Sequence, residues 1–260
     1  MNILVRRVAA VGLFLALASA VDAQTLRVAA ASDLQFAMKE LAGRYEEKTG
    51  TKMEVTYGSS GNFRAQIANG APFDVFFSAD AQYPQQLVSA GAADAGSLSI
   101  YAHGHLVLWA PAGANLGVAG KGFEALKDAR VQKIAIANPE HAPYGRAAVA
   151  ALQKVGLYDQ VKSKLVYGEN ISQAAQFAQS GSAQIGLIAR SLTFAESMKG
   201  GEQWEIPEEL YPALEQAAVV VHSSTNKAAA EAFLAFVTGG DGRKILLKYG
   251  LTPPALPQKP

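Results

Sequence analysis

Four short segments of the sequence combine small or hydroxyl-bearing residues with the expected start of a helix. A helix start leaves backbone N–H groups unpaired and carries partial positive charge. Glycine lets a ligand approach the backbone closely, and hydroxyls are donors that rotate to fit a ligand. If the segments converge, they would bind an anion without any Lys or Arg. The four segments are Ala31-Ser32-Asp33, Gly58-Ser59-Ser60-Gly61-Asn62, Ala142-Pro143-Tyr144-Gly145 and Glu169-Asn170-Ile171-Ser172.

Each segment taken alone has a simpler interpretation, because Ser, Asp and Asn at a helix start commonly serve as N-caps. The adjacent Ser59 and Ser60 exceed what capping requires, so their segment is the most specific of the four. For Asp33 we expect the carboxylate to cap its own helix and to point away from a bound anion, which it would otherwise repel.

Motifs for enzymatic catalysis are weak in this sequence. The run from Gly58 does not complete the hydrolase pattern G-x-S-x-G, because position 62 is Asn. A serine nucleophile at Ser59 or Ser60 would need a histidine within reach, and no motif arranges one. We therefore predict no enzymatic activity and no cofactor, with a secreted serine hydrolase as a remote alternative. The candidate histidines are His103, His105, His141 and His222.

The elements that must position these segments follow from the hydrophobic pattern. Short runs that are apolar throughout predict buried strands of a parallel sheet, and helical patterns that stop at a glycine separate them. This alternation predicts an α/β fold. The predicted strands are Leu26–Ala30, Met53–Tyr57, Val75–Phe77, Leu106–Ala110, Ile134–Ala137, Leu165–Tyr167, Ile185–Ile188 and Ala217–Val221; the predicted helices are Leu34–Thr49, Phe63–Asn69, Arg146–Val155, Ile171–Ser180 and Lys227–Thr238.

The composition narrows the class of protein. The chain has 260 residues, of which 50% are apolar, which is ample for a hydrophobic core. Lys and Arg number 23 against 22 Asp and Glu, a balance that argues against a nucleic-acid partner. There are no cysteines, which excludes disulfides, thiolate metal sites and a lipid anchor on a signal-peptide cysteine.

Residues 1–23 have the three-part pattern of a secretory signal peptide. Arg6 and Arg7 precede the apolar run Val8–Ala20, and small residues at Val21 and Ala23 fit a cleavage site. The apolar run is too short for a comfortable transmembrane helix. We predict cleavage before Gln24 and a neutral, unanchored, monomeric protein in a Gram-negative periplasm.

Six blocks of the sequence resemble the periplasmic molybdate-binding proteins of ABC transporters. They occur in that family's order and spacing over nearly all of the mature chain. The resemblance implies a two-lobed, type II periplasmic binding fold, in which each lobe is a mixed, mostly parallel sheet flanked by helices. The expected lobes are 24–107 plus 218–260 and 108–217, with the ligand in the cleft between them. The six blocks are Ala29–Leu34, Gly58–Gly61, Asn69–Pro72, Phe77–Asp80, Asn138-Pro139 and Ala142–Gly145.

The resemblance also implies the ligand and the residues that hold it. The ligand would be molybdate or tungstate, delivered to an inner-membrane ABC permease, with sulfate, phosphate or another small anion in the same fold as the alternative. A donor-only site suits a fully deprotonated oxyanion, whereas protonated phosphate would need an acceptor. The implied donors are the hydroxyls of Ser32 and Ser60 and the backbones of Asp33, Ser60, Tyr144 and Ile171, with Ser59, Gly61 and Asn170 close behind them.

Overall fold

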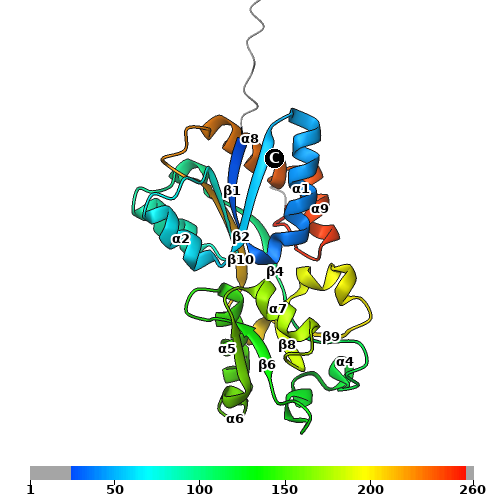
Figure 1. Cartoon of the computed structure of the whole chain (residues 1–260). Coiled ribbons are helices and arrows are strands. Elements are labelled where there is room, and N and C mark those ends of the chain that lie inside the picture. The colour runs from blue at the N-terminus through cyan, green and yellow to red at the C-terminus, as the bar shows by residue number, and fades with distance from the viewer. Residues whose placement is uncertain (1–24, 256–260) are drawn as a thin grey trace, which may run out of the picture.

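The computed structural model describes residues 25–255, so the predicted signal peptide lies outside the described part of the chain. These residues form two lobes, each built on a five-stranded sheet (Figure 1). In spatial order, the first sheet contains β2 (Lys52–Gly58), β1 (Thr25–Ala31), β3 (Val75–Ser78), β10 (Leu214–Val220) and β4 (Ser99–Gly104). The second contains β7 (Leu165–Gly168), β6 (Ile134–Ala137), β8 (Ile185–Ala189), β5 (Leu106–Ala110) and β9 (Glu202–Glu205).

Both sheets are mixed, which confirms the predicted α/β fold with two lobes. β1 runs parallel to β2 and β3, whereas β10 is antiparallel to β3 and β4. β6 runs parallel to β7 and β8, whereas β5 is antiparallel to β8 and β9. The antiparallel share is larger than the apolar runs predicted, because β5 and β10 are also almost entirely buried. A fully apolar run indicates that both faces of the strand are buried, but it does not show whether the strand runs parallel or antiparallel to its neighbours.

Helices cover both faces of the first sheet and make two separate cores. One core packs α1 (Gln35–Thr49), α8 (Lys227–Thr238) and α9 (Gly240–Lys248) around buried residues such as Phe77 and Phe233. The other packs α2 (Ser60–Ala68) and α3 (Gln82–Ser89) around Phe63 and Phe76. All five predicted helices are present, and α1 stops at Gly50, whose φ of 74° lies in the left-handed region.

The second lobe has a single large core. Its helices are α4 (Val118–Lys121), α5 (Pro143–Lys154), α6 (Tyr158–Val161) and α7 (Ile171–Gln179). Six strands and helices of the two lobes are absent from the predicted list: β4, β9, α3, α4, α6 and α9. β9 alternates between half-buried and exposed residues at a sheet edge, so it lacks the apolar run that marks a central strand.

The chain crosses between the lobes at His105, between β4 and β5, and again over residues 206–213, between β9 and β10. The predicted boundaries at 107/108 and 217/218 cut through β5 and β10 and are therefore corrected. Each of these strands belongs wholly to one sheet, since β5 pairs only with β8 and β9, and β10 only with β3 and β4. Pro111 and Gly113 lie beyond β5 and mark no crossing, whereas Pro207 and Pro212 lie within the second crossing.

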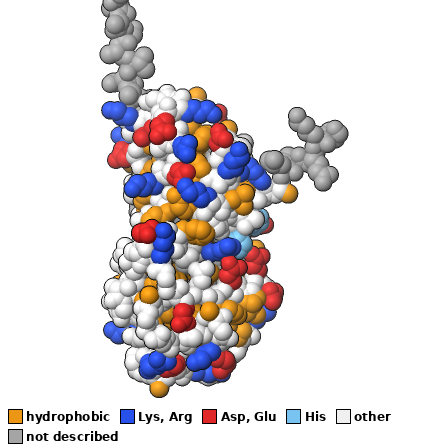
Figure 2. All heavy atoms as spheres, turned by 90° about the vertical axis from the view of Figure 1, so that its right-hand side faces the viewer, with side chains coloured by type: hydrophobic (Ala, Val, Ile, Leu, Met, Phe, Trp, Pro, Cys, Tyr) orange, Lys and Arg blue, Asp and Glu red, His pale blue; other side chains and the backbone are white. Residues whose placement is uncertain are grey.

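The surface agrees with the balanced composition. Charged side chains of both signs are interspersed over the face in Figure 2. Within residues 25–255 no helix combines the length and the apolar character needed to cross a lipid bilayer.

Candidate anion-binding site

The four segments singled out in the sequence meet at one small cavity between the lobes. From the first lobe it is lined by the turns that follow β1, β2 and β3, and from the second by the starts of α5 and α7. Because parallel strands in one sheet present their carboxyl ends at the same edge, these turns are brought to the cleft together. The lining residues are Ala31, Ser32, Asp33, Gly58, Ser59, Ser60, Ala79, Ala142, Pro143, Tyr144 and Ile171.

Most of the hydrogen-bond donors around this cavity are backbone N–H groups. The N–H groups of Asp33, Ser60, Tyr144 and Ile171 each belong to the first turn of a helix or a 3-10 turn. In such a first turn the N–H groups have no acceptor within the helix, and the macrodipole adds partial positive charge. Pro143 begins α5, where its missing N–H costs nothing. The lining therefore favours an anion although it contains no Lys or Arg.

Ser60 is poised to donate its hydroxyl hydrogen. The side chain is 1% exposed, and its Oγ accepts the backbone N–H of Ala79 at 3.0 Å. That contact uses an oxygen lone pair and leaves the hydrogen for another partner. Ser60 is thus oriented by the turn after β3, a relationship that the sequence did not predict.

Ser32 has partners across the cleft. Its Oγ donates to the side-chain oxygen of Asn170 at 3.1 Å and accepts the backbone N–H of Ser172 at 3.3 Å. Asn170 is the N-cap of α7, and the same Oδ1 accepts the N–H of Gln173. In this arrangement the hydroxyl hydrogen of Ser32 is used by Asn170, so Ser32 would have to turn from that oxygen in order to donate to a ligand.

Asp33 differs from its expected role. Its carboxyl group does not cap the 3-10 turn Ser32–Leu34 but lies buried against Gln216 of β10 and Tyr144 of α5. Its Oδ2 accepts from the side-chain amide of Gln216 at 2.5 Å and from the Tyr144 hydroxyl at 3.2 Å. Burial raises the pKa of Asp33 to about 6, against the hydrogen bonds from Gln216, Tyr144 and nearby backbone N–H groups, which lower it.

Gln216 is a residue of this site that our sequence reasoning missed. It is fully buried in β10, and its side chain donates to both Asp33 and the hydroxyl of Tyr144. A signal was present in the sequence, because Gln216 stands among the apolar residues of β10. A buried amide in a core strand needs hydrogen-bond partners and so points to a polar neighbour.

A set of contacts joins the lobes beside the cavity. The Gly61 N–H donates to the carbonyl oxygen of His141 at 2.9 Å, and the Asn62 side chain donates to Glu169 at 2.6 Å. Nδ1 of His141 lies 2.9 Å from Ser59 Oγ, and its Nε2 lies 3.8 Å from the Glu169 carboxylate. These contacts hold the cleft in a closed arrangement.

A second link between the lobes is ionic. Arg146 on α5 lies 2.5 Å from the Asp80 carboxylate, donates to the Tyr83 hydroxyl at 2.9 Å and stacks over the Tyr83 ring. Asp80 also accepts the Tyr83 N–H at 3.0 Å, in the first turn of α3. Arg146 was not singled out in the sequence, since a lone arginine on a helix carries no positional signal.

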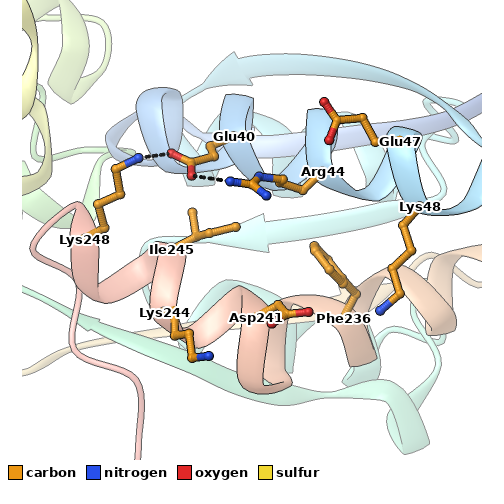
Figure 3. Close-up of a pocket in the computed structure, with 9 residues that line it drawn as sticks. All are labelled: Glu40, Arg44, Glu47, Lys48, Phe236, Asp241, Lys244, Ile245 and Lys248. Atoms are coloured by element: carbon orange, nitrogen blue, oxygen red, sulfur yellow. Dashed lines mark hydrogen bonds and ion pairs between the residues drawn. The ribbon is translucent and has the colours of Figure 1, made fainter.

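A larger hollow lies within the first lobe between α1 and α9 (Figure 3). Its wall mixes acids and bases, and Glu40 is held by Lys248 at 2.6 Å and by Arg44 at 4.0 Å. A site for a small anion needs donors that are free of internal acceptors. Two of the four basic groups here, Arg44 and Lys248, already contact Glu40, and three carboxylates line the same wall. The interlobe cavity is therefore the candidate anion site. The lining residues are Glu40, Arg44, Glu47, Lys48, Phe236, Asp241, Lys244, Ile245 and Lys248.

Known proteins share both the sequence and the architecture of this chain. The family model described as bacterial extracellular solute-binding protein matches residues 26–252. Two curated relatives, each named molybdate-binding protein ModA, are 39% identical to the chain. The protein from Azotobacter vinelandii aligns over 90% of this chain and 92% of its own length, and the one from Rhodobacter capsulatus over 93% of each.

Solved structures of known proteins also resemble this chain. The periplasmic molybdate-binding protein of Azotobacter vinelandii superposes with a TM-score of 0.82 and 35% identity, covering 90% of this chain and all of that one. The sulfate-binding protein SubI of Mycobacterium tuberculosis has a TM-score of 0.73 over 88% of this chain, and its 16% identity shows a shared fold alone. The resemblance drawn from the six sequence blocks is thus confirmed. The chain belongs to the family of bacterial extracellular solute-binding proteins.

Proposed function

We propose that this protein captures molybdate, and tungstate with it, in the cavity between its lobes and delivers the ion to an inner-membrane ABC permease. One observation carries the proposal: helix starts from both lobes converge on a small cavity whose lining contains hydroxyls and backbone donors but no Lys or Arg. The printed names of the 39% identical relatives support molybdate as the ligand.

The chemistry of the lining suits a tetrahedral dianion. Molybdate and tungstate are fully deprotonated near neutral pH, so every oxygen is an acceptor and the site needs only donors. Ser32, Ser60 and the backbone N–H groups of Tyr144 and Ile171 would supply them. A fixed cation would attract anions of many shapes, whereas neutral donors on a rigid cavity can select by size. Sulfate has the same charge and shorter bonds to oxygen, so its rejection would rest on that size difference.

Ligand capture would proceed by hinge closure. The donors are divided between the lobes, so only a closed cleft brings them all to one ion. The two crossings, at His105 and over residues 206–213, are the segments that would bend. Delivery to a permease then requires the closed form to be recognised and reopened. Export by a cleaved signal peptide, a periplasmic location and a monomeric state complete this proposal.

Thermal melting of the mature protein tests it. The protein is melted alone and with molybdate, tungstate, sulfate or phosphate. A ligand at a hundred times its Kd adds about 2.7 kcal/mol, or roughly 5–10 °C for a chain of this size. A rise with molybdate and tungstate alone supports the proposal. A rise with sulfate or phosphate keeps the site and changes its ligand, and no rise with any anion contradicts the proposal.

One contact set favours a second candidate, the secreted serine hydrolase. Ser59, His141 and Glu169 form a chain of contacts of 2.9 and 3.8 Å. Two features oppose it: Ser59 is only 4% exposed, and the nearby Gly61 N–H already donates to His141 instead of being free for an oxyanion. A serine-directed covalent inhibitor separates the two candidates, because labelling of Ser59 requires an activated nucleophile and its absence favours the binding protein.

A further inference from the structure

The two oxygens of the Asp33 carboxyl group have unequal surroundings. Oδ2 accepts from Gln216 and from Tyr144, as described above. Oδ1 is buried and, like Oε1 of Gln216, has no partner at hydrogen-bond geometry among residues 25–255. The backbone N–H groups of Asp33 and Leu34, which lower the pKa of the carboxyl group, do not meet that geometry at Oδ1. Asp33 is 1% exposed and lines the cavity. Because a buried polar atom is normally paired, Oδ1 lacks one partner, and a ligand in the cavity that Asp33 lines is the candidate for it.

The protonation state of Asp33 decides which partner can serve. With two donors on Oδ2, a neutral carboxyl group carries its proton on Oδ1, and Oδ1 then needs an acceptor. An ionised carboxylate would instead need a donor at Oδ1. A fully deprotonated oxyanion has only acceptors, so it can pair with the neutral acid and would be repelled by the carboxylate.

Hydrogen bonds and burial act on this carboxyl group without a neighbouring cation. Tyr101 and Tyr144 are the titratable groups that interact with it, and burial holds the pKa of each hydroxyl well above its usual value, so both stay neutral. Burial raises the pKa of Asp33 itself to about 6. A dianion bound beside Asp33 would raise it further, since a nearby negative charge favours the neutral form.

Within residues 25–255 no ion pair joins Asp33 to a charged group on the surrounding elements. Arg146 on α5 pairs with Asp80, and Arg190, in the 3-10 turn after β8, pairs with Glu205. On α1 the nearest charged residues are Lys39, which is exposed, and Glu40, which is held by Lys248; α7 carries no charged side chain. On β4 and β10, His103 and Glu215 stand opposite each other.

We infer that Asp33 binds the oxyanion as a neutral acid, with Oδ1–H donating to a ligand oxygen, so that capture of the dianion is coupled to the uptake of one proton. This inference rests on the proposed function and adds a proton to it. The balance is simple: the carboxylate takes a proton from the buffer, one O–H bond forms, and the protein–ligand pair carries one negative charge fewer. An anion that brings its own proton, such as hydrogen phosphate, could donate to the ionised Oδ1 and would need no uptake.

The coupling predicts a specific dependence of affinity on pH. Below about pH 6 Asp33 is already protonated in the free protein, so binding takes up no proton and the affinity is flat. Above that value each pH unit weakens molybdate binding tenfold, as long as the bound form keeps its proton. From pH 6.5 to pH 8.5 the Kd for molybdate should therefore rise about a hundredfold.

Calorimetry with the mature protein and sodium molybdate at pH 8, in buffers of different ionisation enthalpy, counts the protons directly. The unmodified protein should take up close to one proton per molybdate. Asp33→Asn should take up none, and its Kd should not vary with pH, because the amide donates at every pH. Asp74→Asn is the matched control: Asp74 is also buried, but both of its oxygens accept hydrogen bonds and it does not line the cavity. It should retain the uptake of the unmodified protein.

The outcomes separate the inference from the function on which it rests. Molybdate binding without proton uptake, or a Kd that is flat from pH 6.5 to 8.5, overturns the inference and leaves the proposed function standing. Equal uptake by the unmodified protein and Asp33→Asn assigns the proton to another group and also overturns it. No binding heat with molybdate at any pH overturns both. The pH series uses the unmodified protein alone, so the test does not depend on how well a variant folds.

Discussion

The backbone N–H of Gly61 in the first lobe donates a 2.9 Å hydrogen bond to the carbonyl oxygen of His141 in the second. This contact brings the two backbones so close that a side chain has no room between them. A Cβ atom on Gly61 would lie 2.7 Å from that carbonyl oxygen and 2.7 Å from the Tyr83 hydroxyl. Gly61 is therefore a residue on which closure of the cleft depends, although it does not line the cavity.

Gly61→Ala should weaken anion binding by keeping the lobes apart. Overpacking of this kind costs about 1–3 kcal/mol, or roughly a 5- to 150-fold rise in the Kd for molybdate. Gly43→Ala on α1 is the control, because nothing lies within 4 Å of its added Cβ. Calorimetry gives the Kd, and small-angle X-ray scattering gives the compaction on ligand addition. If Gly61→Ala binds and compacts like the unmodified protein, the contact does not govern closure.

Ser60→Ala should remove one hydrogen bond to the oxyanion. A hydrogen bond to a charged group contributes roughly 1.5–3 kcal/mol, so the affinity should fall about ten- to hundredfold. Ser89→Ala on the exposed side of α3, where the hydroxyl contacts only the Gln85 carbonyl oxygen, should leave affinity unchanged. Calorimetric titration with molybdate checks both, and equal affinity in the two variants would remove Ser60 from the site.

The ion pair between Arg146 and Asp80 should make a small, salt-sensitive contribution to closure. The Arg146 side chain is 36% exposed, so solvent screens the pair and we expect at most about 1 kcal/mol, or a fivefold change in affinity. A double-mutant cycle with Arg146→Gln and Asp80→Asn measures the coupling at low and high ionic strength. The coupling should shrink as salt rises, because the Debye length falls. A coupling that salt does not change would show that the pair acts through its geometry.

The ligand-free protein should lose stability as pH rises through the titration of Asp33. Its pKa is raised from 3.8 to about 6 in the folded state, so the folded protein binds this proton more tightly than the unfolded chain. The stabilisation is fully present below pH 3.8 and is lost as pH passes 6, a change of roughly 3 kcal/mol. Asp33→Asn should remove this dependence and raise Tm at pH 8. Melting curves from pH 4.5 to 8 check it, and parallel curves for the two proteins would contradict it.

Local sequence features were sufficient to predict most of the elements. Apolar runs and glycine stops identified eight of the strands and five of the helices, because burial on both faces and helix termination are properties of short segments. β9 and α9 were missed, since an edge strand with an alternating pattern and a helix beginning at Gly240 give weak local signals. The lobe boundaries were misplaced by a few residues because the pairing of β5 and β10 with strands distant in sequence decides which sheet each of them joins.

The sequence by itself was enough to predict that small, hydroxyl-rich helix starts would be the binding elements and that their donors would be neutral. These are consequences of residue type and of the position of each segment after a strand. Only the tertiary structure decided how the segments meet: that Ala79 orients Ser60, that Gln216 and Tyr144 hold Asp33, and that Gly61 closes against His141. The raised pKa of Asp33 is likewise a result of the tertiary structure. Its capping role was expected from its place in the chain, whereas its pKa depends on burial between elements that are distant in sequence, and no local pattern records that environment.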